Sequence, residues 1–138
     1  MKKLLLLLVL LISANSFGQT ILGQWETTDD KTGEKKALIE IYQKGDQYFA
    51  KIVDSYISEK GKLCDRCKGS KKNQPIEGLV IIEGLEKDGD EFNGGTILDP
   101  ENGKTYKCYL ELVNKSKLKV RGYLGVSLLG RTQYWTRK

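Results

Sequence analysis

The chain has 138 residues, with 23 basic and 18 acidic side chains and no histidine, and its net charge at pH 7 is +5. This length favours one domain rather than two, and so mild a charge does not indicate a nucleic-acid-binding protein. The absence of histidine excludes the usual general base near neutral pH, the Ser-His-Asp and Cys-His nucleophile systems and the usual zinc enzymes.

The N-terminus has the three parts of a secretory signal peptide. The pair Lys2-Lys3 gives the positive start, residues 4–12 form an unbroken apolar run, and small and polar residues fill positions 13–18. We expect cleavage after Gly18, so that the mature chain begins at Gln19 and is periplasmic or secreted. A retained membrane anchor is the alternative, but the apolar run is much shorter than the roughly 20 residues that span a bilayer.

Short strands separated by turn residues follow in the first part of the mature chain. Residues 36–44 alternate between two faces, with Ala37, Ile39 and Ile41 on one of them. Gly45-Asp46 then gives a two-residue hairpin signal. The strands predicted in this part span residues 21–28, 36–44 and 47–57.

The second part shows the same pattern of strands and turns. Gly94-Gly95 indicates a bulge or a sharp bend inside a strand. Turns are predicted at residues 87–90 and 99–103. One face of a later strand carries Tyr106, Cys108, Leu110 and Leu112. The strands predicted in this part span residues 79–86, 91–99, 104–113, 117–124 and 130–138.

These patterns predict an all-β fold, an antiparallel up-and-down meander of about eight strands in a single domain over residues 19–138. Such a meander closes most naturally into a small barrel, which removes its exposed edges; a two-sheet sandwich is the alternative. A barrel of this size is either filled by side chains or holds one small ligand. Bulky residues on the inward faces favour a mostly filled interior: Trp25, Ile39, Ile41, Leu110, Leu112, Leu118 and Trp135.

One long connection, residues 58–75, interrupts the meander and carries most of the excess positive charge. Residues 59–72 alone sum to +4. Long connections in compact domains are often functional, and we interpret this one as a contact for an anionic envelope surface, with a merely solvated loop as the alternative. Its basic residues are Lys60, Lys62, Arg66, Lys68, Lys71 and Lys72.

The same connection holds Cys64 and Cys67, for which three interpretations stand. A local disulfide is favoured in an oxidising compartment. A redox-active pair would require a βαβ context and a helix after the first cysteine, and a metal site would require further ligands. Cys108 is the odd cysteine, and its strand alternation indicates a small buried hydrophobic residue.

Several motifs together resemble the DUF2147 family of bacterial envelope proteins. They are Gly23-Gln24-Trp25, Cys64-Asp65-Arg66-Cys67, Gly94-Gly95-Thr96-Ile97-Leu98-Asp99-Pro100, Arg121-Gly122-Tyr123-Leu124-Gly125 and Gly130-Arg131-Thr132 with Trp135. The resemblance implies a lipocalin-like barrel, an envelope location and no established activity. The Gly-x-Trp at the first strand and Arg131 (or Arg137) near the end are also similar to lipocalins.

These observations favour a non-enzymatic binding module that holds a small apolar or amphipathic ligand. The candidate ligand-binding residues are Trp25, Arg131 and Trp135, with the alternative that Trp25 and an arginine plug one end of the barrel. A structural or interaction protein with a filled barrel, whose basic loop touches an anionic envelope surface, is the second interpretation, and an enzyme is the third. We expect no catalytic constellation, metal site, cofactor, nucleic-acid partner or membrane span.

Overall fold

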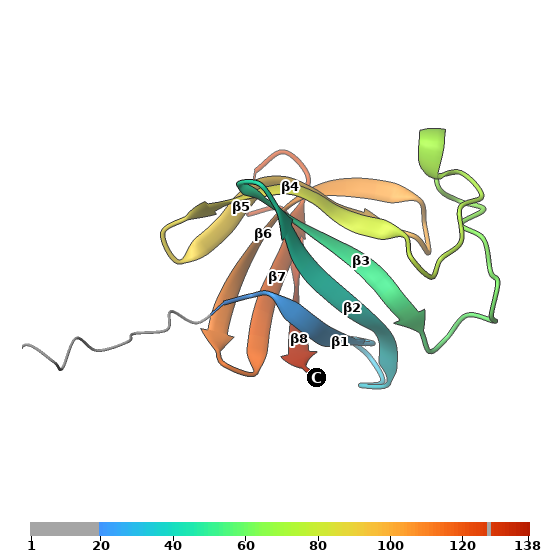
Figure 1. Cartoon of the computed structure of the whole chain (residues 1–138), viewed down its shortest axis with the longest axis horizontal. Coiled ribbons are helices and arrows are strands. Elements are labelled where there is room, and N and C mark those ends of the chain that lie inside the picture. Colours follow the sequence, from blue (N-terminus) through green and yellow to red (C-terminus); the bar gives the residue numbers. More distant parts are fainter. Residues whose placement is uncertain (1–19, 127) are drawn as a thin grey trace, which may run out of the picture.

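A computed structural model describes residues 20–126 and 128–138; the expected signal peptide and its cleavage site lie outside the described residues. Eight antiparallel strands close into a barrel in which each strand pairs with the next in sequence (Figure 1). This confirms the predicted all-β meander. The strands are β1 (Gly23–Thr28), β2 (Lys35–Lys44), β3 (Gln47–Ser55), β4 (Val80–Asp88), β5 (Glu91–Asp99), β6 (Lys104–Asn114), β7 (Lys117–Tyr123) and β8 (Gly130–Arg137).

The barrel is closed by a short seam between its first and last strands. Trp25 pairs with Arg137 and Glu26 with Thr136, and no other residues of β1 and β8 are in register. Closure satisfies the outer edges of both strands, which an open sheet would leave exposed. The alternative of a two-sheet sandwich is therefore wrong.

Strand ends differ from the predicted bounds by a few residues. One such difference is at β4, which extends to Asp88 because Lys87 and Asp88 pair with Phe92 and Glu91. The predicted four-residue turn is therefore only Gly89-Asp90, where the glycine adopts a φ of 62°. Glycine takes such positive φ values at no steric cost, which permits a tight two-residue hairpin.

Side chains fill the barrel at only one end, which we call the closed end. Trp25, Leu110 and Leu118 are fully buried there, and Ile41 is nearly so. The prediction of a mostly filled interior is correct for this end and wrong for the other. Alternation along a strand shows which side chains point inward, but it does not show how far they fill the barrel along its axis.

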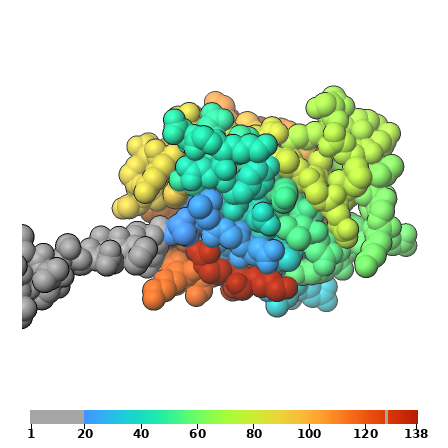
Figure 2. All heavy atoms as spheres, in the orientation of Figure 1, coloured from blue at the N-terminus to red at the C-terminus, as the bar shows by residue number. Residues whose placement is uncertain are grey.

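The long connection between β3 and β4, residues 56–79, folds as a lobe against the barrel wall (Figures 1 and 2). It contains a short 3-10 helix, η1 (Gly69–Lys71). We call this segment the excursion. Its buried residues are Cys64, Cys67, Ile76 and Leu79, and they belong to the same hydrophobic core as the barrel strands. Among the residues described, no helix has the length and apolar character needed to cross a membrane.

Candidate functional site: a cavity at the open end of the barrel

The end of the barrel opposite Trp25 holds a cavity of about 680 Å³. Its mouth is bordered by the β1–β2 loop, the excursion, the β5–β6 turn and the β7–β8 loop. A volume of several hundred Å³ is the usual size for a small-molecule site. The cavity is therefore large enough to hold a ligand rather than a few water molecules.

The inner wall of the cavity is mainly apolar and carries no charged side chain. Uncharged polar side chains also line it, among them Gln133 and Tyr106. The indole Nε1 of Trp135 donates to Oε1 of Gln133 at 3.4 Å, and Nδ2 of Asn102 donates to the Tyr106 hydroxyl at 3.2 Å. An apolar pocket with a few fixed polar groups is typical of ligand sites. The apolar wall residues are Ile39, Ile52, Ile97, Val120 and Trp135.

Gly122 leaves part of the wall without a side chain. A Cβ built at this position would lie 3.5 Å from Cγ2 of Ile97 and 3.7 Å from Cβ of Tyr106, which are ordinary contacts between inward-facing residues. Its backbone φ is not in the left-handed region. The glycine is therefore not required by the backbone here, and its small size adds to the volume of the cavity.

Charged residues line the rim of the cavity, and several of them form ion pairs. Nζ of Lys36 on β2 lies 2.6 Å from Oε2 of Glu101 in the β5–β6 turn, which joins two separate parts of the rim. Nε of Arg131 on β8 donates to Oδ2 of Asp30 at 2.6 Å. A charged ligand head at the mouth would meet both cations and carboxylates, while its apolar part would meet the uncharged wall.

The excursion is held against the rim by a backbone contact. The backbone of Arg66 packs so closely on Gly103 that a Cβ at Gly103 would overlap the Arg66 carbonyl oxygen. The Arg66 guanidinium donates to the carbonyl oxygen of Glu101 at 3.0 Å. A disulfide joins Cys64 and Cys67 on either side of this contact. The disulfide loop therefore fixes the turn that carries Glu101.

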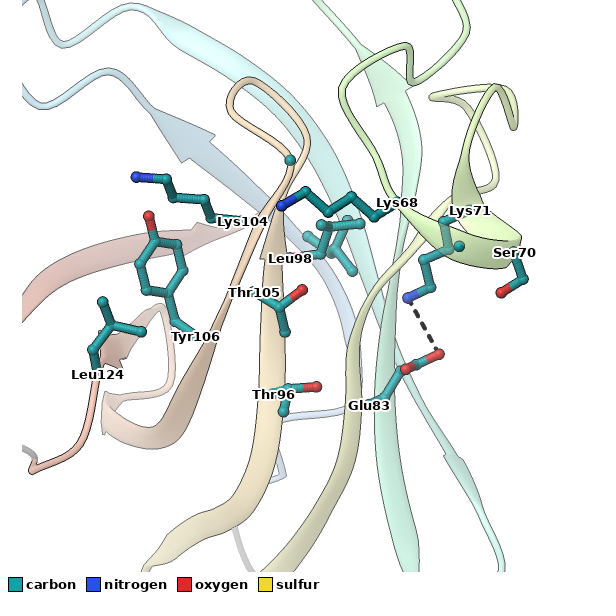
Figure 3. Close-up of a pocket in the computed structure, with 13 residues that line it drawn as sticks. Lys68, Ser70, Lys71, Glu83, Thr96, Leu98, Lys104, Thr105, Tyr106 and Leu124 are labelled. Carbon is teal, nitrogen blue, oxygen red and sulfur yellow. Dashed lines mark ion pairs between the residues drawn. The ribbon is translucent and has the colours of Figure 1, made fainter.

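A second hollow of about 540 Å³, which we call the outer groove, lies between η1 and strands β4 to β6 (Figure 3). Lys71 forms an ion pair there with Glu83 at 3.3 Å. Lys68 and Lys104 also line the groove, and within the described residues neither has a carboxylate within ion-pair distance. Four residues line both hollows, which are therefore adjacent: Ile81, Leu98, Tyr106 and Leu124.

Comparison with known proteins places this barrel in a family. A family model described as "Uncharacterized protein conserved in bacteria (DUF2147)" matches residues 23–137. The chain belongs to the DUF2147 family. The solved structure of HP1028 from Helicobacter pylori, described as belonging to the lipocalin family, aligns with a TM-score of 0.77 and 18% identity over 88% of this chain and 84% of that one. At that identity the likeness shows a shared fold alone. No curated protein matches the chain.

The three predicted ligand-binding residues occupy three different places in this DUF2147 barrel. Trp135 lines the cavity, and Arg131 lies at its rim in the ion pair with Asp30. Trp25 does not line the cavity. It lies at the closed end, where its Nε1 donates to the Ile21 carbonyl at 2.8 Å and the Arg137 guanidinium lies 4.2 Å from its ring centroid. Trp25 and Arg137 thus form a plug.

The six basic residues of the excursion in this DUF2147 protein are mostly engaged within the fold. Lys62 pairs with Asp65 at 3.6 Å, and Lys72 donates to the Asp65 carbonyl. Lys71 and Arg66 make the contacts described above. Among the described residues, Lys60 and Lys68 are the two of the six whose side chains form neither an ion pair nor a hydrogen bond. The predicted contact with an anionic surface would therefore depend chiefly on these two. The sequence patterns assigned no role to Gly122, Gln133 or Tyr106, although alternation already placed Tyr106 on the same face as Cys108 and Leu110.

Thiol alkylation should distinguish the three cysteines. Burial raises the pKa of the Cys108 thiol to about 12, and the thiolate is the reactive form. We expect native, unreduced protein to take up no label, and unfolded, unreduced protein to take up one label, at Cys108. Reduction after unfolding should raise the count to all three cysteines. Mass spectrometry of intact and digested protein measures this, and labelling of Cys64 before reduction would contradict the disulfide.

Proposed function

We propose that this protein is a non-enzymatic binding module of the bacterial envelope that holds a small amphipathic molecule in the barrel cavity. The observation that carries the proposal is the cavity itself, whose inner wall is uncharged and mainly apolar and whose rim is charged. An apolar portion of a ligand would displace water from Ile39, Ile97 and Trp135, which favours binding in proportion to the apolar area buried. Its polar end would stay at the rim.

Two further observations support this assignment. The DUF2147 family match and the lipocalin-family neighbour agree with a barrel of the binding-module kind. The signal-peptide pattern of residues 1–18 supports transport out of the cytoplasm. Among the described residues no group of three or more Cys, Asp or Glu side chains is arranged to hold a metal ion.

Native mass spectrometry of protein purified from its own envelope would identify the natural ligand as an added mass.

Filling part of the cavity should weaken binding and leave the fold intact. We expect Gly122→Val to place its branched side chain beside Ile97 and Tyr106, where the Cβ makes ordinary contacts and a β-branched residue suits the strand. With the fluorescent amphiphile 1-anilinonaphthalene-8-sulfonate as probe, we expect saturable fluorescence enhancement in the wild type and at least about tenfold weaker affinity in Gly122→Val, equivalent to about 1.4 kcal/mol. Thermal unfolding should show that the variant is as stable as the wild type.

The two tryptophans provide a positional control for the same titration. Trp135 lines the cavity and Trp25 lies at the closed end. In Trp25→Phe protein, the remaining Trp135 emission should be strongly quenched by the bound probe. In Trp135→Phe protein, quenching of Trp25 should be weaker. Equal probe affinity in wild type and Gly122→Val, with equal quenching of both tryptophans, would contradict binding in this cavity.

A further inference from the structure

The β7–β8 loop, residues 124–129, exposes an unusual number of aliphatic side chains. Leu124, Val126, Leu128 and Leu129 are all between 58% and 87% exposed. Single exposed apolar residues are normal on a protein surface, but a contiguous apolar patch usually marks an interaction site. Ile57 and Leu63 from the excursion are exposed as well, and they line the same cavity mouth as Leu124 and Leu129.

Hydrogen bonds connect the described parts of this loop, residues 124–126 and 128–129, to each other and to β7. The amide of Leu124 donates to the Leu129 carbonyl at 3.3 Å, and the amide of Leu129 donates to the Val126 carbonyl at 3.0 Å. Arg121 on β7 donates to the Leu128 carbonyl at 3.4 Å. Backbone groups paired in this way carry less desolvation cost when the loop enters an apolar environment. The side chains of Val126 and Leu128 do not line the cavity, so they can make an outside contact without emptying it.

Positive charge lies beside this apolar loop. Leu124 lines the outer groove together with Lys68 and Lys104 (Figure 3), and neither lysine has an ion-pair partner among the described residues. The adjoining segment 59–72 sums to +4. Apolar side chains at a tip with cations beside them match the interface of an anionic bilayer, where the acyl region lies beneath charged headgroups.

We propose that the β7–β8 loop docks the open end of the barrel onto an anionic lipid bilayer. Val126 and Leu128 enter the interfacial region, and Lys68 and Lys104 contact the headgroups. Docking places the cavity mouth, lined by Leu124 and Leu129, against the lipid, so that an amphipathic molecule can move between bilayer and cavity with little exposure to water. The transfer of a ligand between bilayer and cavity rests on the proposed function. The docking itself does not, since Val126 and Leu128 lie outside the cavity.

The test is flotation of the mature protein with vesicles. The probes are phosphatidylcholine vesicles and phosphatidylcholine vesicles that contain phosphatidylglycerol, each at low and high salt. We expect wild-type protein to bind the anionic vesicles at low salt, and binding to fall as salt screens the lysines. We expect the affinity of Val126→Ser/Leu128→Ser for these vesicles to be at least about tenfold weaker, because two aliphatic side chains no longer leave water on binding. The matched apolar control is Val113→Ser, an equally exposed valine near the closed end.

A second pair of variants tests the cations. Lys68→Gln/Lys104→Gln should weaken binding to anionic vesicles and remove most of its salt dependence. Lys87→Gln/Lys115→Gln makes the same charge change near the closed end, on β4 and in the β6–β7 turn, and should bind like the wild type. All these positions lie on the surface, so thermal unfolding should confirm that each variant folds.

The outcomes separate docking from ligand binding. Equal vesicle binding by wild type and Val126→Ser/Leu128→Ser, or binding by neither, would overturn the docking inference. A wild-type dimer that the same substitution converts to a monomer in light scattering would also overturn it, because a second copy would then cover the loop. Vesicle binding that depends on the loop, in a protein that fails to bind the fluorescent probe, would leave docking established and overturn the proposed function. Val126→Ser/Leu128→Ser should keep the probe affinity of the wild type.

Discussion

Trp25→Ala should lower the free energy of unfolding by roughly 3–5 kcal/mol, the usual cost of truncating a fully buried large aromatic residue. Trp25 is 0% exposed and fills the closed end beneath Arg137. Truncation would leave a void that the surrounding strands cannot collapse into, because β1 is tied to both β2 and β8. Urea denaturation, followed by circular dichroism, measures the loss as a lower midpoint at an unchanged slope.

The contacts of Arg137 should contribute to the free energy of unfolding that Trp25→Ala removes. Its guanidinium donates to the carbonyl oxygens of Leu22, Thr20 and Lys115 as well as lying over the Trp25 ring. Trp25→Phe is the matched control, since it keeps an aromatic ring in the plug and should cost clearly less than alanine. A loss of only about 1 kcal/mol in Trp25→Ala, within the range of ordinary substitutions, would contradict the assignment of this end as the filled part of the core.

Gly103→Ala should release the excursion from the rim. Gly103 has a φ of 74° and its Cβ position is occupied by the Arg66 carbonyl oxygen, so alanine forces the two backbones apart. We expect amide hydrogen exchange across residues 61–76 to accelerate well over tenfold, since each loss of about 1.4 kcal/mol changes an opening equilibrium by that factor. The barrel amides of β6 and β7 should keep most of their protection.

Gly33→Ala isolates the contribution of the close contact. Gly33 has nearly the same φ, 73°, but nothing lies within 4 Å of its Cβ position. Gly33→Ala should therefore lower stability only by the backbone cost of a left-handed alanine, about 1–2 kcal/mol. Similar exchange in the excursion for both variants would show that the Arg66–Gly103 contact does not hold it in place. A difference confined to Gly103→Ala would assign that role to the contact.

Local patterns in the sequence predicted the strands well because each strand carries its own signal. Alternation in residues 36–44 and in 104–113 identified inward faces that the structure confirms at Ile39, Ile41 and Leu110. The closed barrel followed from short connections between successive strands. The disulfide also followed from local spacing and is present in the structure.

The open end of the barrel could not be predicted in the same way. Trp25 and Trp135 both belong to inward faces, yet one fills the closed end and the other lines the cavity. The difference depends on their positions along the barrel axis, which follow from the stagger of all eight strands together. The contact between Arg66 and Gly103 joins segments far apart in the sequence, so no local pattern indicates it. The rim ion pair of Lys36 with Glu101 has the same long-range origin.

The seam between β1 and β8 has a consequence for how the chain acquires its cavity during synthesis. Two residue pairs hold these strands in register, compared with six between β1 and β2. The seven pairings between successive strands can form as the chain lengthens, but this last pairing joins the two ends of the domain and carries the largest loop-closure entropy. Val120, Gln133 and Trp135 belong to the final two strands. A nascent or C-terminally truncated chain therefore has no complete cavity wall, and the cavity forms only once the last strand has paired.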